Sequence, residues 1–241
     1  MSEREHDRMP YSVRVEFRTA SSFLVAYSVN LSRGGLFLAT DADIPSGAGI
    51  EIALHVPGAI PIRLIGVVAW GRNEDTQEGP RGLGIELQDP NLQLGLVIDG
   101  LVGTFHGVQV LVLSGDRQDR ATLARSIKSI ISTAEIMQAA DASVASNLLT
   151  TEVDLAVVDL DFDIEGGFAT LAGAKALNPP VPTIAISGSQ VLRDRARAEG
   201  AAEVATNPPS FAELQVVLVR ALSKPVNVQT SAASDEIEVD V

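Results

Sequence analysis

The chain has 241 residues, of which 46% are hydrophobic, and a formal net charge of −13. This length accommodates one large or two ordinary domains with buried cores, and the negative charge argues against general attraction to nucleic acid or an anionic membrane. Cysteine is absent, which excludes disulfides, thiolate metal sites and a cysteine nucleophile. Because the chain as a whole is negatively charged, an anionic ligand would have to be bound by a local cluster of arginines.

The N-terminal segment and the apolar runs indicate the compartment. Residues 1–10, MSEREHDRMP, are charged and lack the apolar centre of a signal peptide. No apolar run reaches the roughly 20 residues that cross a bilayer. We therefore expect a cytoplasmic protein that does not enter a membrane.

The histidines His6, His55 and His106 are not at metal-ligand spacings, so no metal site is expected.

Residues 10–88 alternate apolar and polar positions in short runs, separated by Gly, Pro, Asn and Asp. The runs are YSVRVEF, FLVAYSV, GLFLAT, GIEIALHV, IRLIGVVAW and GLGIEL. This pattern predicts short strands joined by turns, and hence a β-sandwich or small barrel. Trp70 lies in an apolar run and is assigned to core packing. Residues 91–103 are apolar at helical spacing and predict a terminal helix.

From Val108 onward the apolar runs become continuous and alternate with segments of helical spacing. VQVLVLS, DLAVVDL and VPTIAIS are typical of strands that are covered on both faces. This alternation predicts a doubly wound α/β domain with a parallel five-stranded sheet. The predicted domains are residues 1–105 and 106–224. The polar, acidic residues 225–241 are expected to be disordered.

Two short motifs in the first domain could hold an anion. Arg4 and Arg8 precede the first strand, and guanidinium binds phosphate or a guanine edge bidentately and stacks on flat rings. The break between the next strands contains Asn30, Ser32 and Gly35, which offer side-chain hydrogen bonds and close backbone approach. Alternatively, the break is an ordinary hairpin turn, and the arginines belong to a solvated terminus whose acidic residues pair with them.

Together, Arg4-x-x-x-Arg8 and Asn30-x-Ser32-x-x-Gly35 resemble the paired signature of PilZ domains, over residues 3–103. That family consists of six-stranded antiparallel β-barrels that bind cyclic di-GMP, a bacterial second messenger. The resemblance implies that the two arginines grip the phosphates and guanine faces, and that Asn30, Ser32 and Gly35 line the other side. Asn30 departs from the aspartate that is commonest in the family. No cofactor other than this ligand is implied.

Residues 107–223 resemble the receiver domain of bacterial two-component systems. In that family, phosphorylation needs a metal held by an acidic pair after the first strand, an acceptor Asp, a hydroxyl and a lysine. Asp159 and Ser187 occupy the acceptor and hydroxyl positions, whereas Ser114-Gly115 replace the acidic pair and Asn207 replaces the lysine. The metal would lose ligands and the phosphoryl group its cationic partner. The resemblance therefore implies a pseudo-receiver that retains the fold without the chemistry.

The last helical segment, Phe211–Leu222, suggests an interaction surface. Val216–Val219 is apolar on all sides of the helix, and such a helix needs cover on more than one face. We expect a protein partner or self-association there, unless the first domain provides the cover.

The sequence thus predicts a non-enzymatic cyclic di-GMP effector that signals through an interaction domain. Two alternatives remain. One is a response regulator phosphorylated on Asp159, whose first half is only structural, and the other is an interaction module that responds to neither signal. No nucleophile–base pair or intact metal site indicates an enzyme.

Overall fold

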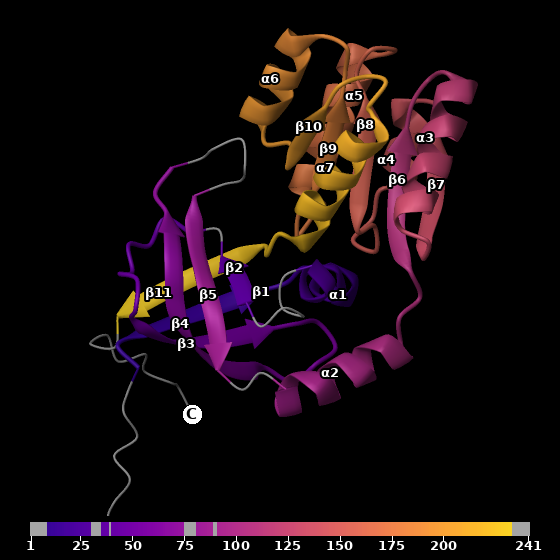
Figure 1. Cartoon of the computed structure of the whole chain (residues 1–241). Helices are drawn as coiled ribbons and strands as arrows, with labels where there is room; N and C mark the ends of the chain where they lie inside the picture. Colours follow the sequence, from indigo (N-terminus) through magenta and orange to yellow (C-terminus); the bar gives the residue numbers. More distant parts are fainter. Residues whose placement is uncertain (1–8, 30–34, 39, 75–80, 89–90, 233–241) are drawn as a thin grey trace, which may run out of the picture. The chain divides into compact units, whose positions relative to one another are not determined.

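The computed structural model describes residues 9–29, 35–38, 40–74, 81–88 and 91–232. The chain divides into two compact units (Figure 1). Unit 1 comprises residues 1–104 together with 225–241, and unit 2 comprises residues 105–224. The chain therefore leaves the first unit, forms the second and returns to the first. The sequence analysis places boundaries after residues 105 and 224 and expects a disordered tail, so it does not predict this return.

Unit 1 contains one curled sheet with the strand order β11-β1-β3-β4-β5-β2 (Figure 1). Its strands are β1 (Tyr11–Glu16), β2 (Gly35–Leu38), β3 (Gly49–His55), β4 (Ile62–Arg72), β5 (Gly82–Gln88) and β11 (Asn227–Ala232). β1 and β3 run parallel, and the other pairs are antiparallel. The sheet is therefore mixed, and the prediction of an antiparallel six-stranded barrel is wrong in this respect. Within the described residues no ladder joins β11 to β2, so closure of a barrel stays a prediction.

Residues 20–29, which include the run predicted as a second strand, form helix α1 (Ala20–Val29). The backbone amide of Ser22 donates to the Thr19 hydroxyl at 3.1 Å, and the Thr19 amide donates to the Ser22 hydroxyl at 3.2 Å. This reciprocal pair satisfies amides that a new helix leaves free. Phe23 is buried and packs edge-on against Phe17 at 5.3 Å between ring centroids. The strand prediction is wrong because a capped helix buries these apolar residues.

The core of unit 1 follows the alternation that the sequence predicts for its strands. The inward side chains of β1, β3, β4 and β5 are buried, and two helices add apolar residues to them. The second helix, α2 (Asn91–Gly103), confirms the predicted terminal helix and contributes Leu94 and Leu101.

Trp70 is an exception to this alternation. A bulge between Val68 and Trp70 shifts the register of β4 against β5 and turns the indole outward, so the side chain is 46% exposed. The ring stacks on Phe37 at 5.6 Å and lies directly over Gly84, where a Cβ would come within 2.2 Å of it. The assignment of Trp70 to the core is therefore wrong.

The strand β11 corrects the prediction of a disordered tail. Residues 227–232 pair antiparallel with the whole of β1, from Glu16 opposite Asn227 to Tyr11 opposite Ala232. Val228 packs against the core of unit 1. Pairing along the free edge of β1 satisfies the backbone of a segment whose composition alone would not fold. Residues 233–241 of the predicted tail lie outside the described residues.

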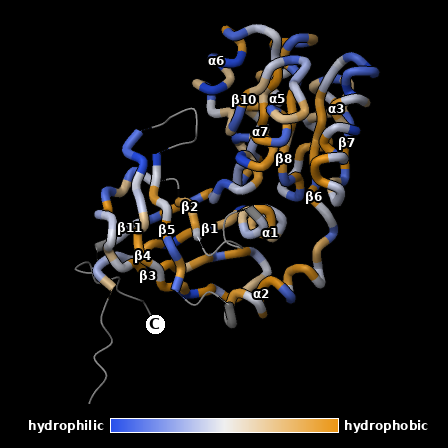
Figure 2. The backbone as a smooth tube through the Cα atoms, in the orientation of Figure 1, coloured by the Kyte–Doolittle hydropathy of each residue, from blue (hydrophilic) through white to orange (hydrophobic). Residues whose placement is uncertain are grey.

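Unit 2 is a parallel five-stranded sheet between two layers of helices, as predicted. Its strands are β6 (Val108–Leu113), β7 (Ala134–Ala139), β8 (Leu155–Asp159), β9 (Thr183–Ile186) and β10 (Glu203–Ala205). The order β10-β9-β8-β6-β7 is the doubly wound arrangement of flavodoxin-like folds. The central strands β6 and β8 are apolar along most of their length (Figure 2), because helices cover both of their faces.

The helices of unit 2 are α3 (Arg117–Ile130), α4 (Ala142–Leu148), α5 (Ile164–Ala176), α6 (Gln190–Glu199) and α7 (Phe211–Ser223). α3 contacts α7, while α5 contacts both α4 and α6, which gives the two layers. Each helix begins after an Asp or Ser whose side chain accepts a backbone amide. Among the helices that the structure describes, none has the length and apolar content that would span a membrane.

Candidate functional site

The predicted anion site of unit 1 is only partly covered by the structure. Arg4, Arg8, Asn30 and Ser32 lie outside the described residues, and Gly35 is the first residue of β2. The described residues that flank the two motifs nevertheless show where each motif joins the sheet.

The flanks of the two motifs lie in one transverse row of the sheet. Gly35 of β2 is opposite Glu86 of β5, which is opposite Val67 of β4, which in turn is opposite Gly49 of β3. Met9, which follows the second predicted arginine, lies against Gly49, since a Cβ on that glycine would come within 2.7 Å of the Met9 sulfur. Met9 and Gly35, the described residues at the ends of the two motifs, therefore lie at the same level of the sheet.

The spacing of the strands gives the distance between the two ends of this row. Neighbouring strands lie about 4.8 Å apart, so the three steps from Gly49 to Gly35 cover roughly 14 Å along the sheet.

In unit 2, the positions predicted for receiver chemistry converge at the carboxyl ends of the strands. The buried carboxylate of Asp159, at the end of β8, accepts a hydrogen bond from the Ser114 hydroxyl at 2.9 Å. It also accepts one from the Asp161 amide at 3.0 Å and one from Asn207 Nδ2 at 3.1 Å. Burial raises the pKa of Asp159, and the bonds from the Asp161 amide and Ser114 offset this only in part.

Asp161 is a site residue that the sequence reasoning missed. Its carboxylate accepts hydrogen bonds from the Ser187 hydroxyl, from the Gly188 amide at 2.8 Å and from Asn207 Nδ2 at 3.0 Å. Burial alone would raise the pKa of Asp161, but these three bonds and the nearby Arg193 outweigh it and lower the pKa. The signal in the sequence was an acidic residue two positions after a strand end.

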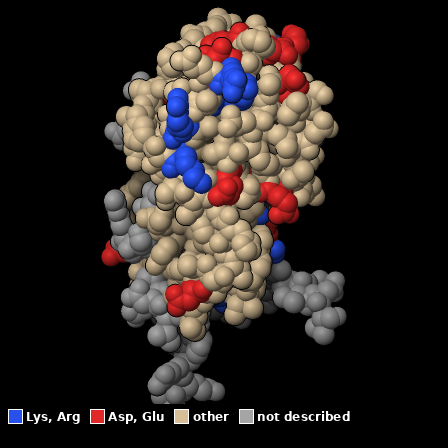
Figure 3. Space-filling model, turned by 90° about the vertical axis from the view of Figure 1, so that its right-hand side faces the viewer, with Lys and Arg blue, Asp and Glu red and all other residues tan. Residues whose placement is uncertain are grey.

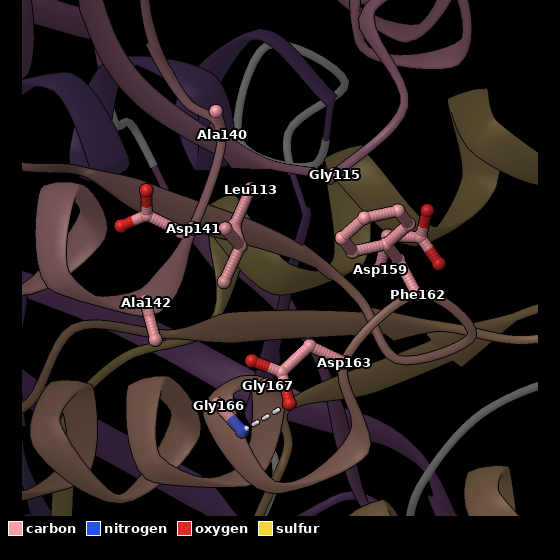
Figure 4. Close-up of a pocket in the computed structure, with 10 residues that line it drawn as sticks. All are labelled: Leu113, Gly115, Ala140, Asp141, Ala142, Asp159, Phe162, Asp163, Gly166 and Gly167. Atoms are coloured by element: carbon pink, nitrogen blue, oxygen red, sulfur yellow. Dashed lines mark hydrogen bonds between the residues drawn. The ribbon is translucent and has the colours of Figure 1, made fainter.

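The residues present do not fit the magnesium ion that a phosphorylated receiver uses. Gly115 stands at one position of the acidic pair, and the Phe162 ring lies against it (Figure 4), so that a Cβ there would be 1.9 Å from the ring. Asp116 instead caps α3, where amides of Gln118 and Asp119 donate to it and lower its pKa. The described residues contain no group of three or more acidic or histidine side chains arranged to hold a metal.

A small cavity of about 30 Å³ lies beside Asp159 (Figure 4). This volume accommodates a water molecule, and it is too small for a nucleotide. Its lining residues are Leu113, Gly115, Ala140, Asp141, Ala142, Asp159, Phe162, Asp163, Gly166 and Gly167.

Replacement of Asp159 by Asn tests the raised pKa of this carboxyl. Because the folded-state pKa of Asp159 is raised, protonation of this carboxyl stabilises the fold. This contribution to stability is fully present below the ordinary pKa of about 3.8 and is lost as the pH rises through the higher folded-state pKa. Asp159→Asn should therefore raise the midpoint of thermal unfolding by a few degrees at pH 7, and the difference from wild type should shrink on acidification below the folded-state pKa. Glu152→Gln, an exposed carboxylate of the same unit, is the control. A variant less stable than wild type at pH 7 would contradict the burial argument.

Comparison with known proteins assigns the first region. The model of the PilZ domain family matches residues 2–102. A search of curated proteins found no match to the chain.

Solved structures resemble the chain over about half its length, in its C-terminal part. One is the signal receiver domain of a DNA-binding response regulator from Colwellia psychrerythraea 34H, with 22% identity, a TM-score of 0.42, and coverage of 46% of this chain and 94% of that one. The receiver domain of the putative response regulator NarL from Mycobacterium tuberculosis has 19% identity, a TM-score of 0.44, and coverage of 49% and 98%. A putative pilus assembly protein from Burkholderia thailandensis E264 has 20% identity, a TM-score of 0.43, and coverage of 48% and 99%.

The strand order of unit 2 supports a receiver-like fold independently of these comparisons. The model of the PilZ domain family thus matches residues 2–102 of this chain, and a receiver-like α/β unit follows them.

Proposed function

We propose that unit 1 binds cyclic di-GMP and that the chain is a non-enzymatic bacterial effector of this second messenger. The PilZ match spans both predicted motifs. The observation that carries the proposal is the row of opposed residues that brings Met9 and Gly35 to one level of the sheet.

In this proposal Arg4 and Arg8 bind the phosphates and guanine faces, while Asn30, Ser32 and Gly35 line the opposite side. The net charge of −13 repels a free anion, so affinity has to come from these local contacts. On the face drawn in Figure 3, the charged side chains of the described residues form small groups of both signs, with uncharged areas between them. Binding that depends on two arginines should weaken as salt is added.

The signal would pass through β1 and β11. β1 directly follows the arginine motif, and its outer edge is paired throughout with β11. β11 is joined to α7 of unit 2 by only three residues, 224–226. In this proposal the ligand binds the arginine motif next to β1, and β1 pairs with the strand that returns from unit 2. The ligand shifts the equilibrium between a ligand-free and a ligand-bound arrangement of these strands by binding one arrangement more tightly than the other.

The test is a calorimetric titration of the full chain with cyclic di-GMP. Binding with a dissociation constant of about 1–10 μM supports the proposal. The absence of binding at a hundredfold higher concentration overturns it, and the Asn30–Gly35 break is then a turn.

The alternative regulator, phosphorylated on Asp159 with a structural first unit, makes an opposite prediction for one variant. Asp159→Ala should abolish the response of that regulator and leave cyclic di-GMP binding unchanged in an effector. The bonds from Ser114, Asp161 and Asn207 already occupy the Asp159 carboxylate, which favours the effector.

For output, we propose that unit 2 binds a protein partner or a second copy of the chain through α7. Phe211 is 56% exposed and Val216 is 47% exposed, whereas Leu214 and Leu218 of the same helix are buried. Val216→Ser should therefore lower self-association about tenfold, measured by sedimentation at several concentrations. Val144→Ser on α4 is the matched control. If neither variant changes the sedimentation of a self-associating chain, self-association does not use α7.

A further inference from the structure

The carboxylate of Asp161 has an unusual set of partners for a loop side chain. One oxygen accepts the Ser187 hydroxyl, and the other accepts both the Gly188 amide at 2.8 Å and Asn207 Nδ2 at 3.0 Å. The donors come from the loops after β9 and β10, whereas Asp161 belongs to the loop after β8. One negative group thus joins three consecutive loops at the carboxyl edge of the sheet.

The donors match the needs of an oxyanion. A hydroxyl, a backbone amide and a side-chain amide are all donors that can bind the oxygens of a phosphate-like group, and bonds to a charged acceptor are about twice as strong as neutral ones. Arg193 adds positive charge nearby, since its guanidinium donates to the Ser187 carbonyl. In this structure the chain itself supplies the anion.

Helix capping does not account for this arrangement. The N-cap of α5 is Asp163, whose carboxylate accepts the Gly166 amide at 3.0 Å (Figure 4). The donors named above for the Asp161 carboxylate instead come from the loops after β9 and β10. Asn207 also bridges the two acidic residues, because the same Nδ2 donates to Asp159 at 3.1 Å.

We infer that Asp161 is an internal anion that occupies the oxyanion position of unit 2 and holds the loops after β8, β9 and β10 in one arrangement without phosphorylation. A phosphoryl group on Asp159 would have to displace the Asp161 carboxylate from Ser187, Gly188 and Asn207. These loops of unit 2 then keep one arrangement whether or not a phosphoryl donor is present. A regulatory signal would have to act through another part of the chain.

The test removes the anion and then supplies one from solution. In the full chain, Asp161→Ala should speed hydrogen exchange of peptides that cover residues 183–190 by about tenfold or more, because the Gly188 amide loses its acceptor. Inorganic phosphate should restore much of this protection, compared with chloride at equal ionic strength. Asp161→Asn should also exchange faster, but phosphate should not rescue it, because the asparagine side chain still fills the position.

The control is Glu152→Ala, which removes an exposed carboxylate from the same unit and should exchange as wild type in either salt. Wild-type exchange in Asp161→Ala would overturn the inference. Faster exchange in Asp161→Ala without phosphate rescue would also overturn it, since Asp161 would then be a structural side chain and not the occupant of an anion site. A wild-type chain that gains the mass of a phosphoryl group from acetyl phosphate and Mg²⁺ would overturn it as well. Cyclic di-GMP binding, measured separately, reports only on unit 1.

Discussion

Arg8→Ala is expected to weaken cyclic di-GMP binding at least about 100-fold, which corresponds to about 2.7 kcal/mol. A guanidinium forms charge-assisted, bidentate bonds to phosphate. The PilZ resemblance assigns phosphate binding to Arg4 and Arg8 and to no other basic residue, so no substitute for Arg8 is expected. Calorimetry gives the affinity directly. Trp70 is the only tryptophan of the chain and is exposed on the sheet of unit 1, so its fluorescence offers a second readout.

The matched control for this prediction is Arg63→Ala. Arg63 lies on β4 of the same unit, is 81% exposed in its side chain, and forms a surface ion pair with Glu51 at 3.3 Å. Its removal changes the net charge by the same amount, and exposed pairs of this kind contribute little to stability. Equal losses of affinity in the two variants would mean that overall charge, and not the Arg4–Arg8 motif, governs binding.

Truncation of the chain after Lys224 is expected to destabilise unit 1 by about 3 kcal/mol. The deletion removes β11, and with it the hydrogen bonds along six residues of β1 and the partly buried Val228. The loss should lower the midpoint of thermal unfolding of unit 1 by several degrees. Truncation after Ala232 keeps β11 and is the control, with unfolding expected to stay close to that of the full chain.

This pair of truncations also tests the proposed signal route. If β11 connects the ligand site to unit 2, the shorter chain should bind cyclic di-GMP more weakly than the longer one, because the strand after the arginine motif has lost its outer partner. Equal stability and equal affinity of the two truncated chains would show that β11 contributes neither to the fold of unit 1 nor to binding.

The parallel sheet of unit 2 was predictable because strands covered on both faces must be continuously apolar. The run FLVAYSV was ambiguous, because a short apolar run fits a strand or a buried helix equally well. The hydrogen bonds between Thr19 and Ser22 cap helix α1 and favour the helix over a strand. Such a cap depends on side-chain geometry, which the apolar pattern does not show. β11 was not predictable from its own polar composition, because its stability comes from a distant strand.

The same distinction applies to the site in unit 2. The convergence of Ser114, Asp159 and Asn207 was predictable, because the carboxyl ends of parallel strands meet at one edge. The role of Asp161 was not, because three donors on two other loops determine where its side chain points. The bulge that exposes Trp70 likewise depends on one extra residue in β4, which alternation alone does not reveal.

The pairing of β1 with β11 also has a consequence for biosynthesis. Glu16 and its hydrogen-bonded partner Asn227 are 211 positions apart, and the whole of unit 2 is synthesised between them. At roughly 5–20 residues per second, the ribosome needs about 10–40 s to produce this interval. Throughout that time β1 presents an unpaired edge, which is a point of attack for proteases and for aggregation. Only a chain translated past residue 232 covers this edge, so incomplete products should be removed selectively.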